Sequence, residues 1–332
     1  MSKNFIPTIN ISSLIKNNFE TQNAFKTIKE IEKACINVGF FQITGHGINQ
    51  KEIKKTCEVA NKFFNLPDSM KRRLAPKKWN KKNKNLYRGY FPNDVNGKEG
   101  LDMGDLKVTK KYSSNINNQY IEHLNLSLCF NKNSINILNK YFDNIYRLSE
   151  TLFKSVIKLN KKNPDISSAA FSRLKTLSTL RFNYYPNQTK PVEISKQDGV
   201  VLGCETHVDS GIFTVLYQDK KGGLQVQNRH TKEWINVPQI PNAFVINLGD
   251  LMSRWTNDRW TSTPHRVVPP PRDIKGSTRR QSIAFFVNIR ANEEVSVLPS
   301  CIEEGKEPKY PPINAMKFLL EKHAASTQGI KI

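Results

Sequence analysis

The sequence of 332 residues has little that would hold a fold together covalently or place it in a membrane. Its five cysteines lie far apart, are odd in number and form no C-x-x-C pair, so a disulfide framework is not expected. No apolar run is long enough to cross a membrane, and the first residues contain no apolar signal-peptide segment. We therefore expect reduced thiols and a soluble, cytoplasmic protein.

Acidic residues are also scarce, since 29 Asp and Glu stand against 51 Lys and Arg and give a formal net charge of +22. Such an excess raises the local concentration of anions, from nucleic acid to small carboxylates. The densest basic run, residues 71–84, contains no acid, and we interpret it as a mobile, solvated surface loop rather than a phosphate-binding patch. Neither zinc-finger spacings nor the aromatic signature of nucleic-acid-binding sheets accompanies it, so nucleic-acid binding is not favoured.

Apolar side chains make up 38% of the chain, which is enough for a large core without structural metal. Helical spacing of apolar residues predicts helices over 24–37, 50–65 and 134–160, and a short strand is expected over 39–43. Beyond about residue 175, short β-rich runs separated by Gly and Pro predict an antiparallel sandwich or barrel. Strands are expected over 177–185, 213–218, 224–228, 234–237, 244–248 and 282–288. Both halves are expected to share one core.

Three polar residues in the β-rich half form a pattern with metal-binding chemistry. His207 and Asp209 are two positions apart, so at a strand end both side chains would point to the same face. A second imidazole, His265, follows much later in the chain. Two imidazoles and one carboxylate are the ligand set of non-haem Fe(II) oxygenases, which leaves coordination positions open. A closed structural zinc site would need four protein ligands.

A second polar pair, Arg280 and Ser282, opens an apolar strand. A guanidinium that points into a barrel is costly unless it meets an anion, and its fork matches a carboxylate. Taken alone, pairing of Arg280 with a buried Asp or Glu is the better interpretation. However, the pair follows the His-x-Asp motif and the distant histidine in the sequence, and this order favours the interpretation that Arg280 binds the carboxylate of a ligand.

Further short motifs share this order over nearly the whole chain. They are Gly39-Phe40-Phe41-Gln42-Ile43-Thr44-Gly45-His46-Gly47-Ile48, Phe63-Phe64-Asn65-Leu66-Pro67, Arg88-Gly89-Tyr90-Phe91-Pro92 and Arg181-Phe182-Asn183-Tyr184-Tyr185-Pro186. With His207-x-Asp209, His265 and Arg280-x-Ser282 after them, they resemble the isopenicillin-N-synthase-like branch of the Fe(II)/2-oxoglutarate-dependent dioxygenases. One departure is a long segment between His265 and Arg280, which includes Pro269-Pro270-Pro271.

The resemblance implies a mainly β fold with flanking helices, a distorted double-stranded β-helix (jelly roll). Residues 1–175 would form the helix-rich N-terminal region and residues 176–332 the jelly-roll core, as one functional unit. It assigns Fe(II) to His207, Asp209 and His265, with no catalytic residue beyond the metal centre. It assigns the distal carboxylate of 2-oxoglutarate to Arg280 and Ser282, with Asn183 and Tyr185 as further contacts. O2 is the other cosubstrate, and ascorbate is a candidate reductant.

The substrate expected from the resemblance and the charge is a small molecule with at least one carboxylate. Arg88, in a family landmark that can border the active-site mouth, is a candidate clamp for that group. The alternative is that Arg88 anchors its loop to a backbone carbonyl. Hydroxylation, desaturation and ring closure begin with the same hydrogen abstraction, so the sequence leaves the product open, as it does the identity of the substrate and the oligomeric state.

Three other functions stay open from the sequence. One is an Fe(II) oxidase of the same fold that uses no 2-oxoglutarate, which Asn183 and Tyr185 disfavour. Another is a nucleic-acid demethylase, but that group resembles an Arg-x5-Arg pattern, and Phe286 stands six residues after Arg280. The third is a non-catalytic jelly-roll binding protein, which the intact His-Asp-His set disfavours.

Overall fold

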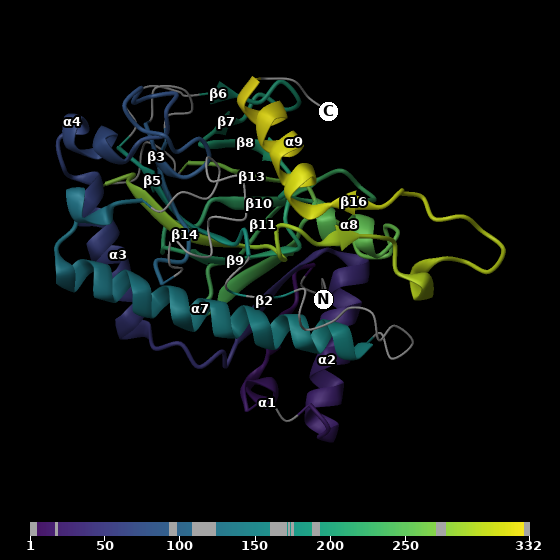
Figure 1. Ribbon diagram of the computed structural model, residues 1–332. Helices are drawn as coiled ribbons and strands as arrows, with labels where there is room; N and C mark the ends of the chain where they lie inside the picture. Colours follow the sequence, from purple (N-terminus) through teal and green to yellow (C-terminus); the bar gives the residue numbers. More distant parts are fainter. Residues whose placement is uncertain are drawn as a thin grey trace.

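Two facing sheets and a layer of helices make up the fold of the computed structural model (Figure 1). The structure describes residues 5–16, 19–92, 98–107, 124–159, 171, 173, 176–187, 193–269 and 277–328. The larger sheet has the order β1 (Thr8–Asn10), β2 (Phe40–Thr44), β12 (Phe244–Leu248), β9 (Phe213–Gln218), β14 (Arg280–Val287), β5 (Thr179–Tyr185), β4 (Glu99–Met103) and β3 (Gly89–Phe91). The smaller sheet has the order β11 (Trp234–Asn236), β10 (Leu224–Gln227), β13 (His265–Val267) and β8 (Cys204–His207).

Two short strand pairs and the helices complete the described fold. The pairs are β6 (Glu193–Ile194) with β7 (Val201–Leu202) and β15 (Glu294–Val295) with β16 (Ile313–Asn314). The helices are α1 (Ser12–Ile15), α2 (Gln22–Asn37), α3 (Gln50–Phe64), α4 (Asp68–Lys71), α7 (Lys132–Leu159), α8 (Asp250–Trp255) and α9 (Ala315–Gln328). Helices α2 and α3 begin at side-chain caps, where Thr21 and Asn49 accept hydrogen bonds from the backbone of the first turn. The long helix α7 runs along one side of the larger sheet, with α2 and α3 beside it (Figure 1).

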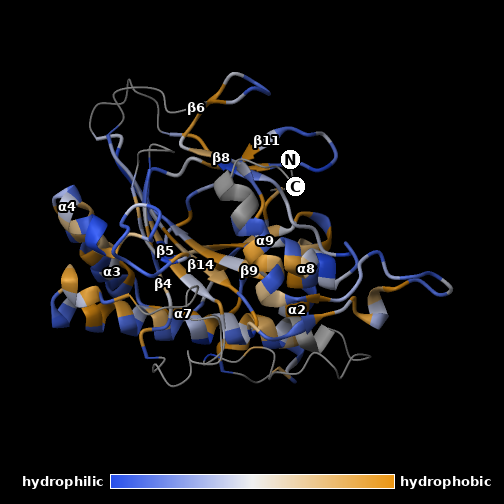
Figure 2. Cartoon of the chain, turned by 45° about the horizontal axis from the view of Figure 1, so that its top comes forward, coloured by the Kyte–Doolittle hydropathy of each residue, from blue (hydrophilic) through white to orange (hydrophobic). Residues whose placement is uncertain are grey.

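Side-chain alternation gives the larger sheet two different faces. One face packs against the helices and belongs to the main core; it includes Leu180, Phe182 and Tyr184 of β5 and Ile283, Phe285 and Val287 of β14. Apolar residues of α7, orange in Figure 2, alternate along the helix with hydrophilic ones. The inner face, toward the smaller sheet, takes the intervening residues of the same strands. Polar residues two positions apart therefore enter the space between the sheets together.

The predicted jelly roll is confirmed, and its antiparallel strands lie where the alternation of the sequence indicates. The expected strands 213–218 and 244–248 coincide with β9 and β12, and the three expected helices correspond to α2, α3 and α7. The N-terminal half also contributes to the larger sheet, because β2 pairs with β12 and β4 pairs with β5. No helix in the described ranges is both long and apolar enough to span a membrane.

The basic run 71–84 differs from the expected solvated loop at its first residue. Lys71 is buried and forms an ion pair with Glu99, which also accepts a hydrogen bond from Tyr90. The backbone of the run is held by Asn83, whose amide donates to two carbonyls, while the lysines between 77 and 84 are exposed. Lys71 therefore fixes α4 to β4 instead of adding to the surface charge.

Candidate metal centre

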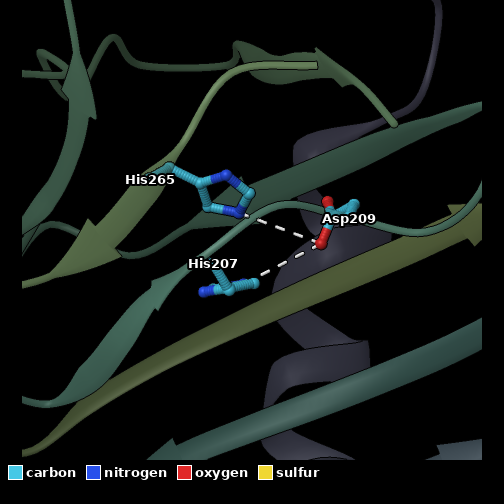
Figure 3. A group of neighbouring side chains, drawn as sticks. All are labelled: His207, Asp209 and His265. Carbon is cyan, nitrogen blue, oxygen red and sulfur yellow. Dashed lines mark ion pairs between the residues drawn. The ribbon is translucent and has the colours of Figure 1, made fainter. Parts of the chain in front are cut away.

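Strand pairing brings the two distant histidines together. In the antiparallel pair of β8 and β13, His207 lies directly opposite His265, and their ring centroids are 4.3 Å apart. Asp209 follows the end of β8, and its Oδ1 lies 3.8 Å from the Nε2 atom of each histidine (Figure 3). One ligand atom from each residue can be chosen so that all lie within 4.8 Å of one another. The structure thus gathers the three predicted ligands around one point.

Each of these side chains is oriented by a hydrogen bond on its far side. His207 Nδ1 lies 2.7 Å from the carbonyl of Glu205, and His265 Nδ1 lies 3.2 Å from the carbonyl of Thr263. A protonated Nδ1 donating to a carbonyl leaves the lone pair on Nε2, the atom that faces Asp209. This tautomer is the one a metal ligand needs.

Asp209 is buried and held in the same way. Its Oδ2 accepts hydrogen bonds from Thr214 Oγ1 at 2.5 Å and Asn247 Nδ2 at 2.7 Å, so Oδ1 is directed at the histidines. Burial raises the pKa of Asp209, but the two imidazoles and these hydrogen bonds outweigh it and hold the pKa below its usual value. Burial and the neighbouring His207 lower the pKa of His265. The Asp209 carboxylate and the neutral His265 imidazole can therefore bind a divalent metal at neutral pH, whereas the pKa of His207 is raised to about 9, so this imidazole must lose a proton before it binds.

The side chain of His207 is 41% exposed, whereas those of His265 and Asp209 are 9% and 7% exposed. The centre is thus open to solvent beside β8 and closed on the other side. Three protein ligands with an open side match the donor set of non-haem Fe(II) sites.

Deeper between the sheets, the strand register groups the four residues expected to bind the cosubstrate. Arg280 pairs with Tyr185 across β14 and β5, and Ser282 pairs with Asn183, whose amide lies 3.4 Å from the Ser282 hydroxyl. Arg280 is only 1% exposed, and its guanidinium lies 4.7 Å from the centroid of the Tyr185 ring.

Among the residues that the structure describes, no acid lies around Arg280 to neutralise it. Within the described residues it donates to the carbonyl of Gly222 and to Ser282, and no carboxylate pairs with it. Gln218, opposite Ser282 on β9, is buried with both amide atoms unpaired. A buried cation and an unpaired buried amide are costly unless an anion with further acceptor atoms binds them. A dicarboxylate such as 2-oxoglutarate fits this set.

Arg88 lies elsewhere in the fold. It is buried, and its guanidinium donates to the carbonyls of Leu177 and Ser178 and to Thr179 Oγ1. This geometry contradicts the hypothesis that Arg88 clamps a substrate carboxylate and matches the alternative of a loop anchor. The position of Arg88 in a sequence motif gives no information on its burial. Burial is the property that distinguishes the clamp from the anchor.

Several residues of the centre were not singled out from the sequence. Thr214 and Asn247 orient Asp209, and no sequence spacing marks them because they come from separate strands. Arg181 and Lys98 add cationic groups near the site. Arg181 shares the inner face of β5 with Asn183, forms a two-point ion pair with Asp102 and stacks over Phe286. The sequence signal that could have identified Arg181 is its position two residues before Asn183, which places both side chains on one face of the strand.

Comparison with known proteins gives matches over both halves of the chain. The model of the 2OG-Fe(II) oxygenase superfamily matches residues 176–289, and that of the non-haem dioxygenase in morphine synthesis N-terminal region matches residues 6–124. The 2-oxoglutarate-Fe(II) type oxidoreductase hxnY of Emericella nidulans is 31% identical over 307 residues, which cover 87% of this chain and 81% of that protein. A probable iron/ascorbate oxidoreductase of Dictyostelium discoideum is 32% identical over 291 residues, or 79% of this chain and 76% of that one.

Among solved structures, a full-length Neurospora crassa protein in complex with alpha-KG superposes with a TM-score of 0.75 at 25% identity. The match covers 98% of each chain. The crystal structure of the dioxygenase for auxin oxidation in rice gives a TM-score of 0.72 at 21% identity, covering 98% of this chain and 96% of that one, and supports the fold alone.

Proposed function

The chain belongs to the 2OG-Fe(II) oxygenase superfamily, and from this premise we propose that it oxidises a small, carboxylate-bearing molecule at a centre formed by His207, Asp209 and His265. The enzyme class and the use of Fe(II) and 2-oxoglutarate follow from the family. The observation that carries the assignment of the centre is the convergence of two Nε2 atoms on one carboxylate oxygen, with the other oxygen already hydrogen-bonded.

The cosubstrate-binding residues in this proposal are Arg280, Ser282, Asn183 and Tyr185. Arg280 would pair with the distal carboxylate of 2-oxoglutarate in a site from which water is excluded, and Ser282 would donate to the same group. The unpaired amide of Gln218 supplies a further donor and acceptor beside Ser282. When bound together, Fe(II), 2-oxoglutarate and O2 provide the oxidising power for hydrogen abstraction from a C–H bond, with release of succinate and CO2. The protein supplies positioning and exclusion of water.

The proposal of an anionic substrate rests on where the basic run lies. Trp79, within that run, packs edge-on against Phe91 with ring centroids 5.4 Å apart, and Arg181 lies over the same Phe91 ring. Trp79 thus brings the basic run next to Phe91, and the exposed Lys78 lies over the Trp79 ring. Exposed positive charge near a site increases the rate at which anions reach it, and salt reduces the effect.

Two further features belong to the same proposal. Residues 1–175 and 176–332 act as one functional unit, because strands from both form the larger sheet that carries Arg181 and Arg280. The protein works in the cytoplasm, in keeping with five cysteines that are all free.

The test is a screen of small metabolites, each acid beside its methyl ester, for stimulated release of succinate from 2-oxoglutarate by the iron-loaded protein. We expect stimulation by acids, and a loss of it at high salt. Product formation without 2-oxoglutarate would favour the oxidase instead. Failure to bind iron would favour a non-catalytic binding protein. Equal stimulation by acids and their esters would refute the proposal of an anionic substrate.

A further inference from the structure

Strand β8 contains a β-bulge beside the metal centre, because two of its residues, Glu205 and Thr206, face the single residue Arg266 of β13. A bulge bends its strand and can redirect a side chain. We propose that Arg266 is a positioning residue: from the outer face of the smaller sheet it holds this bulge in place, and the bulge directs His207 toward His265. The inference rests on the proposed function and deepens it, because it names what sets the orientation of one proposed ligand.

The bulge decides the face of the smaller sheet to which His207 points. Cys204 and His207 are three positions apart, so in a regular strand their side chains would point to opposite faces. Both point inward instead. Cys204 packs against the apolar cluster between the sheets, and the rings of His207 and His265 have centroids 4.3 Å apart. The extra residue of the bulge accounts for this change of face, since regular pairing would turn His207 outward.

The bulge also supplies the hydrogen bond that orients the imidazole. His207 Nδ1 lies 2.7 Å from the carbonyl oxygen of Glu205, the first residue of the bulge. When Nδ1 donates to this carbonyl, the Nε2 lone pair is left for a metal. A displacement of the bulge would therefore change both the position and the rotation of the ring.

Arg266 lies on the opposite face of the same sheet and is firmly held there. Its neighbours His265 and Val267 point inward, so its own side chain points away from the larger sheet, yet Arg266 is only 2% exposed. Its Nε donates to Gln225, the residue opposite it on β10, at 2.8 Å. Its guanidinium lies 4.1 Å from the centroid of the Trp234 ring on β11. The side chain is thus fixed across three strands.

An ion pair joins Arg266 to the segment that leads into the bulge. Arg266 Nη2 lies 2.7 Å from Oδ2 of Asp198, in the turn between β6 and β7. One residue, Gly203, separates β7 from β8, and its backbone N–H donates to the carbonyl of Val267 at 2.7 Å. The chain before the bulge is therefore tied to β13 through Gly203 and through the Arg266 side chain. Loss of the guanidinium should allow this segment, and the bulge after it, to shift.

The experiment measures metal binding by protein purified without metal. Co(II) is titrated into each protein, because its visible absorption reports both affinity and ligand geometry. Wild type is compared with Arg266→Met, which keeps the apolar stem, Arg266→Lys, which keeps the charge, and Asp198→Asn, which weakens the ion pair from its more exposed partner. The matched control is Arg88→Ala, since Arg88 is also a buried arginine but donates to carbonyls elsewhere in the fold. The Tm and the amide hydrogen exchange of residues 203–208 are measured without metal.

We expect Arg266→Met to raise the Kd for Co(II) by about 10- to 100-fold, the range for residues that orient a metal ligand, with an altered spectrum and faster exchange over residues 203–208. Arg266→Lys and Asp198→Asn should raise the Kd by smaller factors. Arg88→Ala should lower the Tm and leave the Kd unchanged.

The proposal is overturned if Arg266→Met binds Co(II) as wild type does, or if Arg88→Ala loses as much affinity as Arg266→Met. Should Arg266→Met fail to fold, a wild-type Kd in Asp198→Asn overturns it equally. Failure of the proposed function is distinct, because wild type itself would then not bind Co(II).

Discussion

Asn247 Nδ2 lies 2.7 Å from Oδ2 of Asp209, although 38 positions of sequence separate the two residues. The contact comes from β12, while the other donor to the same oxygen, Thr214, comes from β9. Together they form hydrogen bonds with one carboxylate oxygen of Asp209 and direct the other oxygen at His207 and His265. The orientation of the carboxylate is thus set by two strands that carry none of the proposed metal ligands. It can therefore be tested by substitutions that leave the metal ligands unchanged.

Asp209→Ala should abolish both metal binding and 2-oxoglutarate turnover, because the two imidazoles alone do not form the proposed site. Asn247→Ala should keep the metal but lower its affinity by about 10- to 100-fold, the range for outer residues that orient a ligand. Metal content after dialysis and succinate release measure the two effects. Full activity of Asp209→Ala would refute the assignment of the centre.

Arg280→Lys should raise the KM for 2-oxoglutarate by at least about tenfold, because an ammonium cannot reproduce the two parallel hydrogen bonds of a guanidinium. The matched control is Arg279→Lys. Arg279 is next in sequence but lies over the Tyr184 ring and donates to Asn61, on the helix-facing side. Initial rates measured against 2-oxoglutarate concentration give the KM of each variant. An equal change of KM in both variants would argue against a specific role for Arg280.

The fold and the centre could be predicted where the signal is periodic or lies within a motif. Period-two alternation placed β9 and β12, and it also assigned Arg280 and Ser282 to one face. His207 and Asp209 were recognised because their separation matches that alternation. His265 needed the ordered motifs, since its partnership with His207 is a contact between strands far apart in the sequence.

The residues that were misjudged or missed depend on burial and on contacts that no local pattern encodes. Arg88 and Lys71 resemble accessible cations in the sequence, yet one is bound to backbone carbonyls and the other to Glu99. Lys98 looks like any other lysine of a basic chain until β4 is paired with β5 and β8 is brought against it. Only tertiary structure separates a solvated charge from one held near the centre.

Arg88→Ala should lower the free energy of unfolding by about 2–4 kcal/mol, because buried carbonyls lose their donor and a cavity remains. Arg73→Ala, which removes an exposed guanidinium nearby, should change it by less than about 0.5 kcal/mol. Denaturant unfolding measures both variants. Any residual activity of Arg88→Ala should keep the wild-type preference for acid over ester, and loss of that preference with unchanged stability would restore Arg88 as the clamp.

Gly39→Ala should destabilise the junction between α2 and β2. Gly39 has φ +70°, and an added Cβ would lie 2.0 Å from the carbonyl oxygen of Thr261. Gly199 has the same φ but open space around it, so Gly199→Ala isolates the conformational cost, about 1 kcal/mol. We expect a clearly larger loss of Tm for Gly39→Ala. Equal losses would mean that the backbone at Thr261 moves aside.

Metal binding at pH 7 should release about one proton per ion, and the proton should come from His207. Burial alone would lower the pKa of His207, but the negatively charged Cys204 sulfur and Asp209 raise it to about 9 in the metal-free protein. A raised pKa means that the imidazole is protonated at pH 7 and must lose that proton to become a ligand. His265 and Asp209, whose pKa values are lowered, are already unprotonated and release none.

Calorimetric titration with Mn(II) in buffers of different protonation enthalpy counts the released protons. Apparent affinity should rise with pH, by up to about tenfold per unit, until the pKa of His207 is passed, because proton and metal compete for one nitrogen. Cys204→Ala removes the first cause of the raised pKa without touching a proposed ligand, so it should reduce the proton release and flatten the pH dependence. A wild type that releases no proton, or a Cys204→Ala variant that releases as many as wild type, would show that Cys204 does not control the charge of His207.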